Sequence, residues 1–211
     1  MVKEEHYTLP PSGNEDQGHK YIAAAWVLVM AALFSSLVRI AVRSRLTRNM
    51  GSDDWWMIIT MISNLVGLGF VTQEWRDGEG RHMYYLSKPQ IENFGVIGWL
   101  DWMQTFITIC FCKISICMFL LRIKDTRANK WFMYSLIAAN VVVTIVVTGM
   151  FAGLCTPPNA YWKINKPGHC LTKQREMAIV IAQGRTYFFL SLAPTSFCVH
   201  LFFLELLRNP Y

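Results

Sequence analysis

The sequence predicts an all-α protein, a multi-pass bundle of transmembrane helices. Three observations indicate this class: 53% of the 211 residues are hydrophobic, only 16% are charged, and the mean hydropathy is +0.27. Soluble domains carry about 25% charged residues, so a water-soluble globule is excluded. The aromatic content of 14% also excludes a disordered chain, because such chains lack the apolar surface that offsets conformational entropy.

Five apolar runs are each long enough to cross a bilayer, for which a helix needs about 20 residues. They place a membrane domain at about residues 21–207, between a flexible polar tail at 1–20 and a short tail at 208–211. Several runs are apolar nearly all round, whereas a soluble bundle needs polar outer faces. The expected spans cover about residues 21–43, 54–74, 93–122, 131–154 and 176–206.

The basic residues of the chain, whose net charge is +6, occur in short clusters that flank the apolar runs. Such clusters are typical of membrane-protein loops, so the expected partner is a lipid bilayer and not nucleic acid. The clusters at residues 43–48 and 122–130 lie closest to span ends, which favours a cytosolic side there and an N-terminus outside. The first span then acts as an uncleaved signal anchor, and the plasma membrane is the expected location.

Cys155 and Cys170 lie in one polar loop after the fourth expected span. A disulfide between them would require the oxidising, non-cytosolic side of the membrane, which again places the N-terminus outside. Two free thiols are the alternative. The remaining cysteines, at positions 110, 112, 117 and 198, lie within spans and are expected to pack as small residues.

Polar residues inside the spans are the candidate ligand or packing groups, because they are costly in hydrocarbon unless they face the bundle interior. They recur at helical spacing on three faces. These are Asp101, Gln104, Thr108, Cys112 and Ser115 in the third span, Thr60, Ser63, Asn64 and Gly67 in the second, and Asn140, Thr144 and Thr148 in the fourth. The faces can line one shared cavity, or they can make interhelical hydrogen bonds, which is the commoner role.

Charged groups within the spans lead to two further expectations. Lys113 is expected to extend toward the inner end of its helix, with a charge relay or a contact to an anion as the alternative. Asp101 and Arg185 lie at similar depths counted from the outer ends of their spans, so we expect an ion pair between them. No catalytic order of nucleophile and base and no metal-ligand spacing is recognisable, so neither an enzyme nor a metal site is expected.

The second span opens on Ser52-Asp53-Asp54-Trp55-Trp56, which combines a helix cap, acids at the positive end of the helix dipole and interfacial tryptophans. The segment Gly78-Glu-Gly80-Arg81-His82 follows this span. It lacks the preceding strand and the spacing of a phosphate-binding loop, so it predicts a tight turn.

Four ordered motifs together resemble the fungal rhodopsin-like-domain family. They are Asp53-Asp54-Trp55-Trp56, Gly78-x-Gly80-Arg81-His82, the stretch from Lys113 through Ser115 to Arg122, and Cys155-x6-Trp162-x7-Cys170, within about residues 20–183. The family comprises seven-span fungal membrane proteins, including receptor candidates for surface sensing and a satratoxin-cluster membrane protein. The resemblance implies an outside N-terminus, a Cys155–Cys170 disulfide and a bundle that senses or accommodates small or lipophilic molecules. The lysine and arginine of the family map to Lys113 and Arg122.

After Gln183 the chain departs from the family pattern, and only five of the seven spans are expected. We therefore expect a truncated product in which residues 184–211 are substitute sequence. No late-span lysine is present to hold retinal, so no cofactor is expected. The resemblance implies a receptor-type sensor of extracellular cues, with a cytosolic signalling partner at the basic inner loops. The alternatives are a transport or accessory membrane protein of a secondary-metabolite pathway, or a non-functional truncated product.

Overall fold

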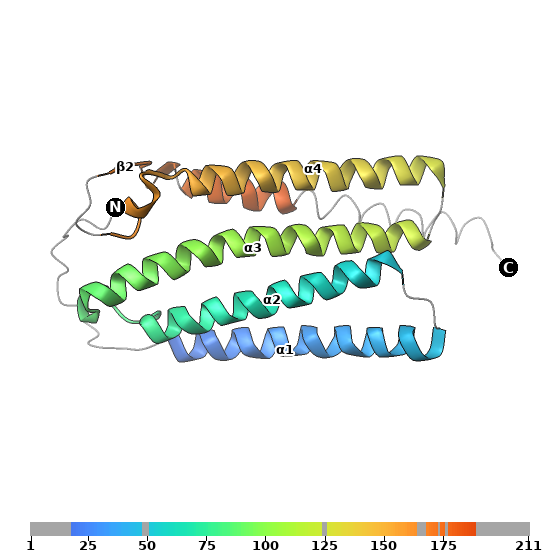
Figure 1. Cartoon of the computed structure of the whole chain (residues 1–211), viewed down its shortest axis with the longest axis horizontal. Helices are drawn as coiled ribbons and strands as arrows, with labels where there is room; N and C mark the ends of the chain where they lie inside the picture. The colour runs from blue at the N-terminus through green and yellow to red at the C-terminus, as the bar shows by residue number, and fades with distance from the viewer. Residues whose placement is uncertain are drawn as a thin grey trace.

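The computed structural model confirms the predicted all-α, multi-pass bundle (Figure 1). It describes residues 18–47, 51–123, 126–163, 168–172, 174–175 and 177–188. Residues 1–17 of the expected N-terminal tail, the expected C-terminal tail, Cys198, and residues 176 and 189–206 of the expected fifth span lie outside these described residues. The expected N-terminal tail is shorter than predicted, because residues 18–20 already belong to the first helix.

Four long helices run back and forth along the molecule (Figure 1). They are α1 (Gly18–Val42), α2 (Ser52–Asp77), α3 (Lys88–Ile123) and α4 (Arg127–Ala152), and the described part of the fifth expected span is helical at 177–188. At 1.5 Å per residue even the shortest of the four long helices measures about 37 Å, more than the hydrocarbon core of roughly 30 Å. All four are apolar enough to cross a membrane. A helix is the stable form there because it satisfies its own backbone hydrogen bonds.

α3 begins five residues before the expected start at residue 93. The expectation followed hydropathy, and the first turn of this helix, Lys88-Pro-Gln-Ile-Glu92, is largely polar. Pro89 fits a first turn, where its missing N–H leaves no hydrogen bond unmade. The carboxamide oxygen of Gln90 accepts from both the backbone N–H (3.0 Å) and the hydroxyl (2.8 Å) of Ser87. The helix therefore extends beyond its apolar run.

Short elements connect the helices at the two ends of the bundle. The π-helix η1 (Arg43–Thr47) follows α1, the 3₁₀ turn η2 (Met83–Tyr85) precedes α3, and α4 leads into β1 (Cys155–Thr156), the 3₁₀ turn η3 (Pro158–Ala160) and β2 (His169–Cys170). We call the end with Arg43–Thr47 and the start of α2 the arginine end. The end with β1 and β2 is the disulfide end.

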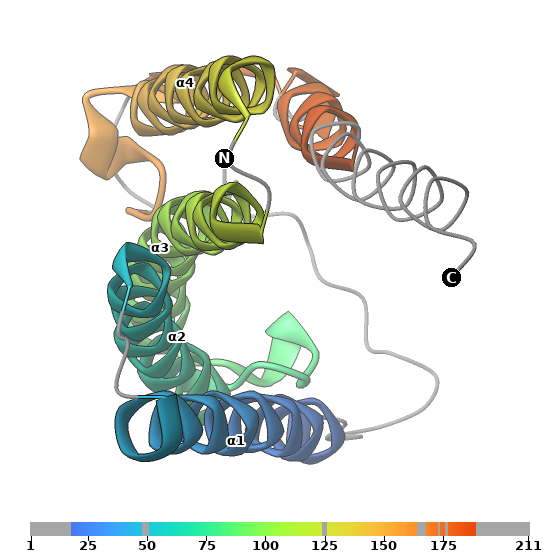
Figure 2. The ribbon, with the colours of Figure 1, turned by 90° about the vertical axis from the view of Figure 1, so that its right-hand side faces the viewer.

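The described helices follow an open arc in chain order when the bundle is viewed from its arginine end (Figure 2). α2 packs between α1 and α3, and α4 packs against α3 on the other side. Phe106 of α3, Phe151 of α4 and Leu154 form a buried cluster, in which the two phenylalanine rings meet edge to face at 5.5 Å. Large apolar side chains of α1 such as Leu28 and Phe34 are 70% exposed, as expected of a face turned to lipid.

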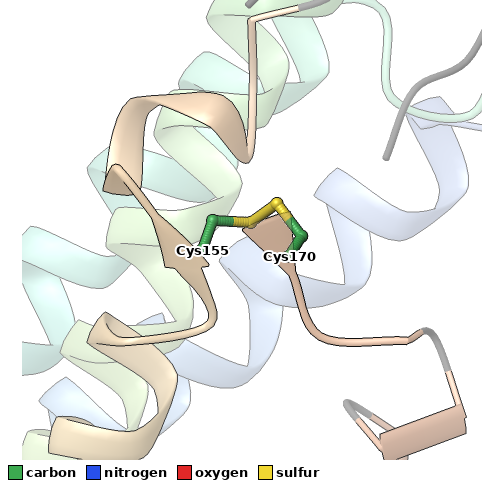
Figure 3. Close-up of a disulfide and its surroundings, with 2 residues drawn as sticks. All are labelled: Cys155 and Cys170. Atoms are coloured by element: carbon green, nitrogen blue, oxygen red, sulfur yellow. A yellow bond between two sulfur atoms is a disulfide. The ribbon is translucent and has the colours of Figure 1, made fainter. Parts of the chain in front are cut away.

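The predicted disulfide between Cys155 and Cys170 is present (Figure 3). The two cysteines face each other across the antiparallel pair of β1 and β2. Trp162 in the enclosed loop packs its ring 5.6 Å from that of Trp99 on α3. A Cβ on Gly95 would lie 2.8 Å from the Cβ of Trp162, so the glycine allows the loop to approach α3 closely. The disulfide loop thus covers the part of α3 at the disulfide end.

Candidate functional site

A polar cavity of about 270 Å³ lies between α1, α2 and α3. Its polar lining comes mainly from α2 and α3, whereas α1 contributes Tyr21, Ala25 and Val29. The polar residues that line it are Tyr21, Ser63, Asn64, Asp101, Gln104, Thr105 and Thr108. Four of the predicted ligand or packing residues, Asn64, Asp101, Gln104 and Thr108, therefore meet at one cavity.

Hydrogen bonds between α2 and α3 hold one wall of this cavity. The carboxamide nitrogen of Gln104 donates to the hydroxyl oxygen (2.7 Å) and the carbonyl oxygen (3.1 Å) of Ser63. The hydroxyls of Ser63 and Thr108 are 2.7 Å apart. Asn64 instead donates to the carbonyl of Thr60 on its own helix, at 3.0 Å. The polar faces of α2 and α3 thus form interhelical hydrogen bonds with each other and also line the cavity.

The polar face of α4 does not line this cavity, so the alternative in which all three faces share one cavity does not hold. Asn140 is buried and donates to the carbonyl oxygen (3.3 Å) and the sulfur (3.2 Å) of Cys110 on α3. The hydroxyl of Thr144 lies 2.9 Å from that of Tyr187 in helical residues 177–188. α3 separates the two polar regions, because α2 and α4 pack on different sides of it. Cys112, which continues the expected stripe on α3, is exposed.

Three carboxylates approach one another at the disulfide end of this cavity, and we call Glu74, Glu79 and Asp101 the carboxylate trio. Glu74 is only 7% exposed and interacts electrostatically with the other two. Burial and the nearby Asp101 raise the pKa of Glu79, which lies in the turn beyond α2. One carboxylate oxygen of Glu79 is buried without a hydrogen-bond partner.

The expected ion pair between Asp101 and Arg185 is wrong. Asp101 lines the cavity beside α1 and α2, whereas Arg185 is an exposed residue of the segment 177–188. Among the described residues, the ion pairs of the bundle involve only Asp53 and Asp54 as acids. Similar depth in the membrane did not imply contact, because depth leaves the direction of each side chain around its helix undetermined.

A second polar site lies at the arginine end, where Asp53 and Asp54 are 2% and 0% exposed. We call these two residues with Arg39, Arg43 and Arg122 the aspartate–arginine cluster. Arg43 Nη1 lies 2.8 Å from Asp53 and 3.0 Å from Asp54. Arg39 Nη2 lies 2.9 Å and Arg122 Nη1 3.2 Å from Asp53. Three helices, α1, α2 and α3, therefore meet through buried carboxylates.

Local structure at the start of α2 differs in one detail from the expectation. The N-cap residue is Gly51, and Ser52 is already the first helical residue. The carboxylate of Asp54 accepts the backbone N–H of Gly51 at 3.0 Å, which is the N3 half of a capping box, and no side chain at the N-cap position accepts an N–H of the first turn. The hydroxyl of Ser115 on α3 donates to the backbone carbonyl of Asp53 at 3.4 Å.

Sequence reasoning missed Arg39 of α1 and Arg43 of η1 as partners of Asp53 and Asp54. A signal was present: Arg39 and Arg43 are four residues apart and share one helix face close to the connection that leads to the aspartates. Antiparallel neighbours with a short connection bring such ends together. The same guanidinium groups lie over the ring of Phe119, at 4.6 Å for Arg39 and 5.9 Å for Arg43.

Lys113 bridges α3 to the segment 177–188. Its ammonium donates to the backbone carbonyl of Tyr187 at 2.6 Å and lies 4.4 Å from the centre of the Tyr187 ring. Lys113 therefore binds a neighbouring helix inside the bundle. Its expected extension toward the inner end of its own helix stays a prediction.

A family model for the fungal rhodopsin domain matches residues 38–193, well over half of the chain. The chain belongs to the fungal rhodopsin domain family. No curated protein and no solved structure matches it. The matched interval includes residues 184–193, which we had expected to be substitute sequence outside the family pattern.

Apart from Lys113, the motif residues of this fungal rhodopsin domain lie toward the two ends of the bundle. Asp53, Asp54, Ser115 and Arg122 meet at the arginine end, where Trp55 is 62% exposed. At the other end, Gly78 and Gly80 adopt positive φ angles of 113° and 89°, and Arg81 N–H closes a turn on the carbonyl of Gly78. His82 accepts the backbone N–H of Tyr84 through Nδ1, and Trp162 packs on α3. Both groups of motif residues therefore shape helix ends and connections.

Replacement of the motif lysine tests its role as a bridge. We expect Lys113→Met to loosen residues 177–188, because a hydrogen bond from a charged group contributes about 1.5–3 kcal/mol. Amide hydrogen exchange in that segment should become at least about tenfold faster, with α2 unaffected. Lys163→Met, which removes an exposed loop lysine, is the control. Equal exchange rates in the two variants would contradict the bridge.

Proposed function

We propose that this fungal rhodopsin domain protein is a receptor-type sensor that binds a small molecule in the polar cavity. One observation carries the proposal, a cavity of about 270 Å³ whose wall combines hydrogen-bonding groups with apolar side chains. Ligand sites in proteins are typically concave and largely apolar, with a few polar groups that orient the ligand. No catalytic step is part of the proposal.

The proposal includes an orientation in the plasma membrane, with the disulfide end and the N-terminus outside. A stable disulfide favours the oxidising side, and clustered basic residues favour the cytosolic side. The arginine end carries Arg45 in η1 and Arg127 and Lys130 in the first turn of α4, and a cytosolic signalling partner would bind there. The cavity residues Tyr21 and Asp101 lie in the halves of α1 and α3 that are closer to the disulfide end. A ligand would therefore arrive from outside.

A cavity-filling substitution tests this function. A Cβ added to Gly67, which lines the cavity, meets nothing within 4 Å, so Gly67→Phe should fill the space without displacing the backbone. Gly69 also has open space around it but is exposed and does not line the cavity, so Gly69→Phe is a matched control on the same helix. Both variants are returned to a fungal strain that lacks the gene, and transcription is compared across defined extracellular chemicals.

We expect the deletion to abolish part of the transcriptional response. Gly69→Phe should restore it, whereas Gly67→Phe should leave at most about a tenth of it, because the ligand and the phenyl ring compete for one space. Restoration by both variants would refute the cavity as the sensing site. The deletion strain could instead keep its full transcriptional response but lack a metabolite or accumulate an intermediate. That result would support the alternative, a transport or accessory role in a secondary-metabolite pathway.

A further inference from the structure

We propose that the polar cavity takes a small organic cation, a protonated amine with an apolar body, held by Asp101 and the ring of Tyr21. The inference rests on the proposed small-molecule site and names the chemical class of its ligand. Four features carry it: the charge at the cavity, the burial of an unpaired carboxylate, the position of an aromatic ring, and the apolar wall.

The charge around this end of the cavity is negative. The carboxylate trio contributes three acids, and no ion pair in the described part of the chain involves any of them. Of the three, Asp101 lines the cavity together with Tyr21. Carboxylates in a poorly solvated site are costly unless a positive charge accompanies them. Within the described residues, no ion pair brings a positive charge onto the trio.

Glu74 is the most buried acid of the trio, at 7% exposed, and its side chain makes no hydrogen bond within the described residues. Its carboxylate points toward α3, where a Cβ on Gly98 would lie 3.3 Å from Oε1. Gly98 is one helical turn before Asp101, on the same face. Glu74 does not line the cavity, but its unpaired carboxylate faces α3 about one turn from Asp101, which does.

Aromatic and apolar groups complete the recognition surface. Tyr21 and Asp101 both line the cavity, one from α1 and the other from α3. A cation near an aromatic face gains attraction from the ring quadrupole, and a carboxylate adds a charge-assisted hydrogen bond. The rest of the lining combines apolar side chains with the hydrogen-bonding groups of α2 and α3 already described; the apolar ones are Ala25, Val29, Leu68, Val71 and Ile109. This lining suits a molecule with a positive head and a body that is largely apolar.

A metal ion fits the geometry less well than an amine. Across the described residues, no three carboxylate, thiol or imidazole side chains are placed to hold one metal ion. An ammonium group needs fewer ligands, because one carboxylate and one ring face already bind it. The cavity volume of about 270 Å³ limits the ligand to a small molecule with roughly one ring.

The test uses the full chain in nanodiscs of a zwitterionic lipid at pH 7.5. Two probes of the same shape are compared by ligand-observed NMR, 2-phenylethylammonium and the neutral 2-phenylethanol, with empty nanodiscs as the blank. We expect the ammonium to bind at least about tenfold more tightly than the alcohol. Asp101→Asn and Tyr21→Leu should each remove most of this preference. Glu92→Gln, an acid of α3 outside the trio, is the matched control and should keep it.

Three results would overturn the inference. They are equal binding of both probes, ammonium binding that survives Asp101→Asn, and no binding of either probe up to about 10 mM. Equal binding that Gly67→Phe abolishes would remove the preference for cations while leaving the small-molecule site intact. If Asp101→Asn does not fold, Tyr21→Leu and Glu79→Gln provide the same comparison, because both residues lie near the membrane surface.

Discussion

Asp54→Asn is expected to lower the free energy of unfolding by about 3 kcal/mol, since breaking a buried charge pair by removing one partner costs about 3–5 kcal/mol. Asp54 is fully buried, with Arg43 at 3.0 Å, Arg39 at 3.7 Å and Arg122 at 3.8 Å. The substitution leaves three guanidinium groups around the single carboxylate of Asp53. It also weakens the acceptor for the backbone N–H of Gly51 at the start of α2.

The protein is purified in mild detergent and heated to a series of temperatures. The fraction that remains in its main peak in size-exclusion chromatography is then measured at each temperature, which gives the melting temperature. Asp77→Asn, at the opposite end of the same helix, should change the melting temperature little. The double variant with Arg43→Gln should regain part of the lost stability, because one uncompensated charge is removed with the acid. Strictly additive losses in the double variant would argue against a buried cluster.

Loss of the Cys155–Cys170 disulfide is the other change with a large expected effect. The bond joins cysteines separated by 15 residues, a loop for which chain entropy predicts about 3 kcal/mol of stabilisation. The double variant Cys155→Ser/Cys170→Ser should therefore melt at a lower temperature than the wild type. Because the enclosed loop packs Trp162 on α3, the variant should also expose that tryptophan and shift its fluorescence to longer wavelength.

Reduction of the wild-type protein should reproduce both effects without any substitution. Cys112→Ser is the matched control, because Cys112 is an exposed free cysteine, and this variant should respond to reductant as the wild type does. Mass spectrometry of unreduced peptides should find residues 155 and 170 linked. A melting temperature that reductant leaves unchanged would contradict a stabilising disulfide.

The two predicted effects concern opposite ends of the bundle, and the candidate ligand cavity lies between them. The aspartate–arginine cluster joins α1, α2 and α3 at one end, and the disulfide loop rests on α3 at the other. α1 contacts α2 through few other buried groups, since none of its apolar side chains is fully buried. The ion pairs of Arg39 and Arg43 therefore help to fix the position of α1 against α2, and with it the cavity wall to which Tyr21 belongs.

The amino-acid sequence by itself determined the all-α membrane fold, the four long helices to within a few residues, the disulfide and the family. Each of these follows from short-range information. Hydrocarbon requires a helix wherever an apolar run is long enough, and two cysteines in one short loop have few other partners. The observed start of α3 lies before the predicted one because hydropathy does not detect a helical turn made of polar residues. Pro89 and the hydrogen bond between Ser87 and Gln90 nevertheless favour a helix there.

Only the tertiary structure decided which polar groups meet. Spacing along a helix placed Asp101, Gln104 and Thr108 on one face, but it could not show that Ser63 would bond to that face while Asn140 would bond to the opposite side of α3. The sequence also suggested Arg185 as the partner of Asp101 because the two lie at similar depths in their spans, whereas in the structure Asp101 lies near Glu74 and Glu79. The rotation of each helix about its own axis depends on packing against neighbours. That packing involves contacts between residues far apart in the chain, which local sequence patterns do not specify.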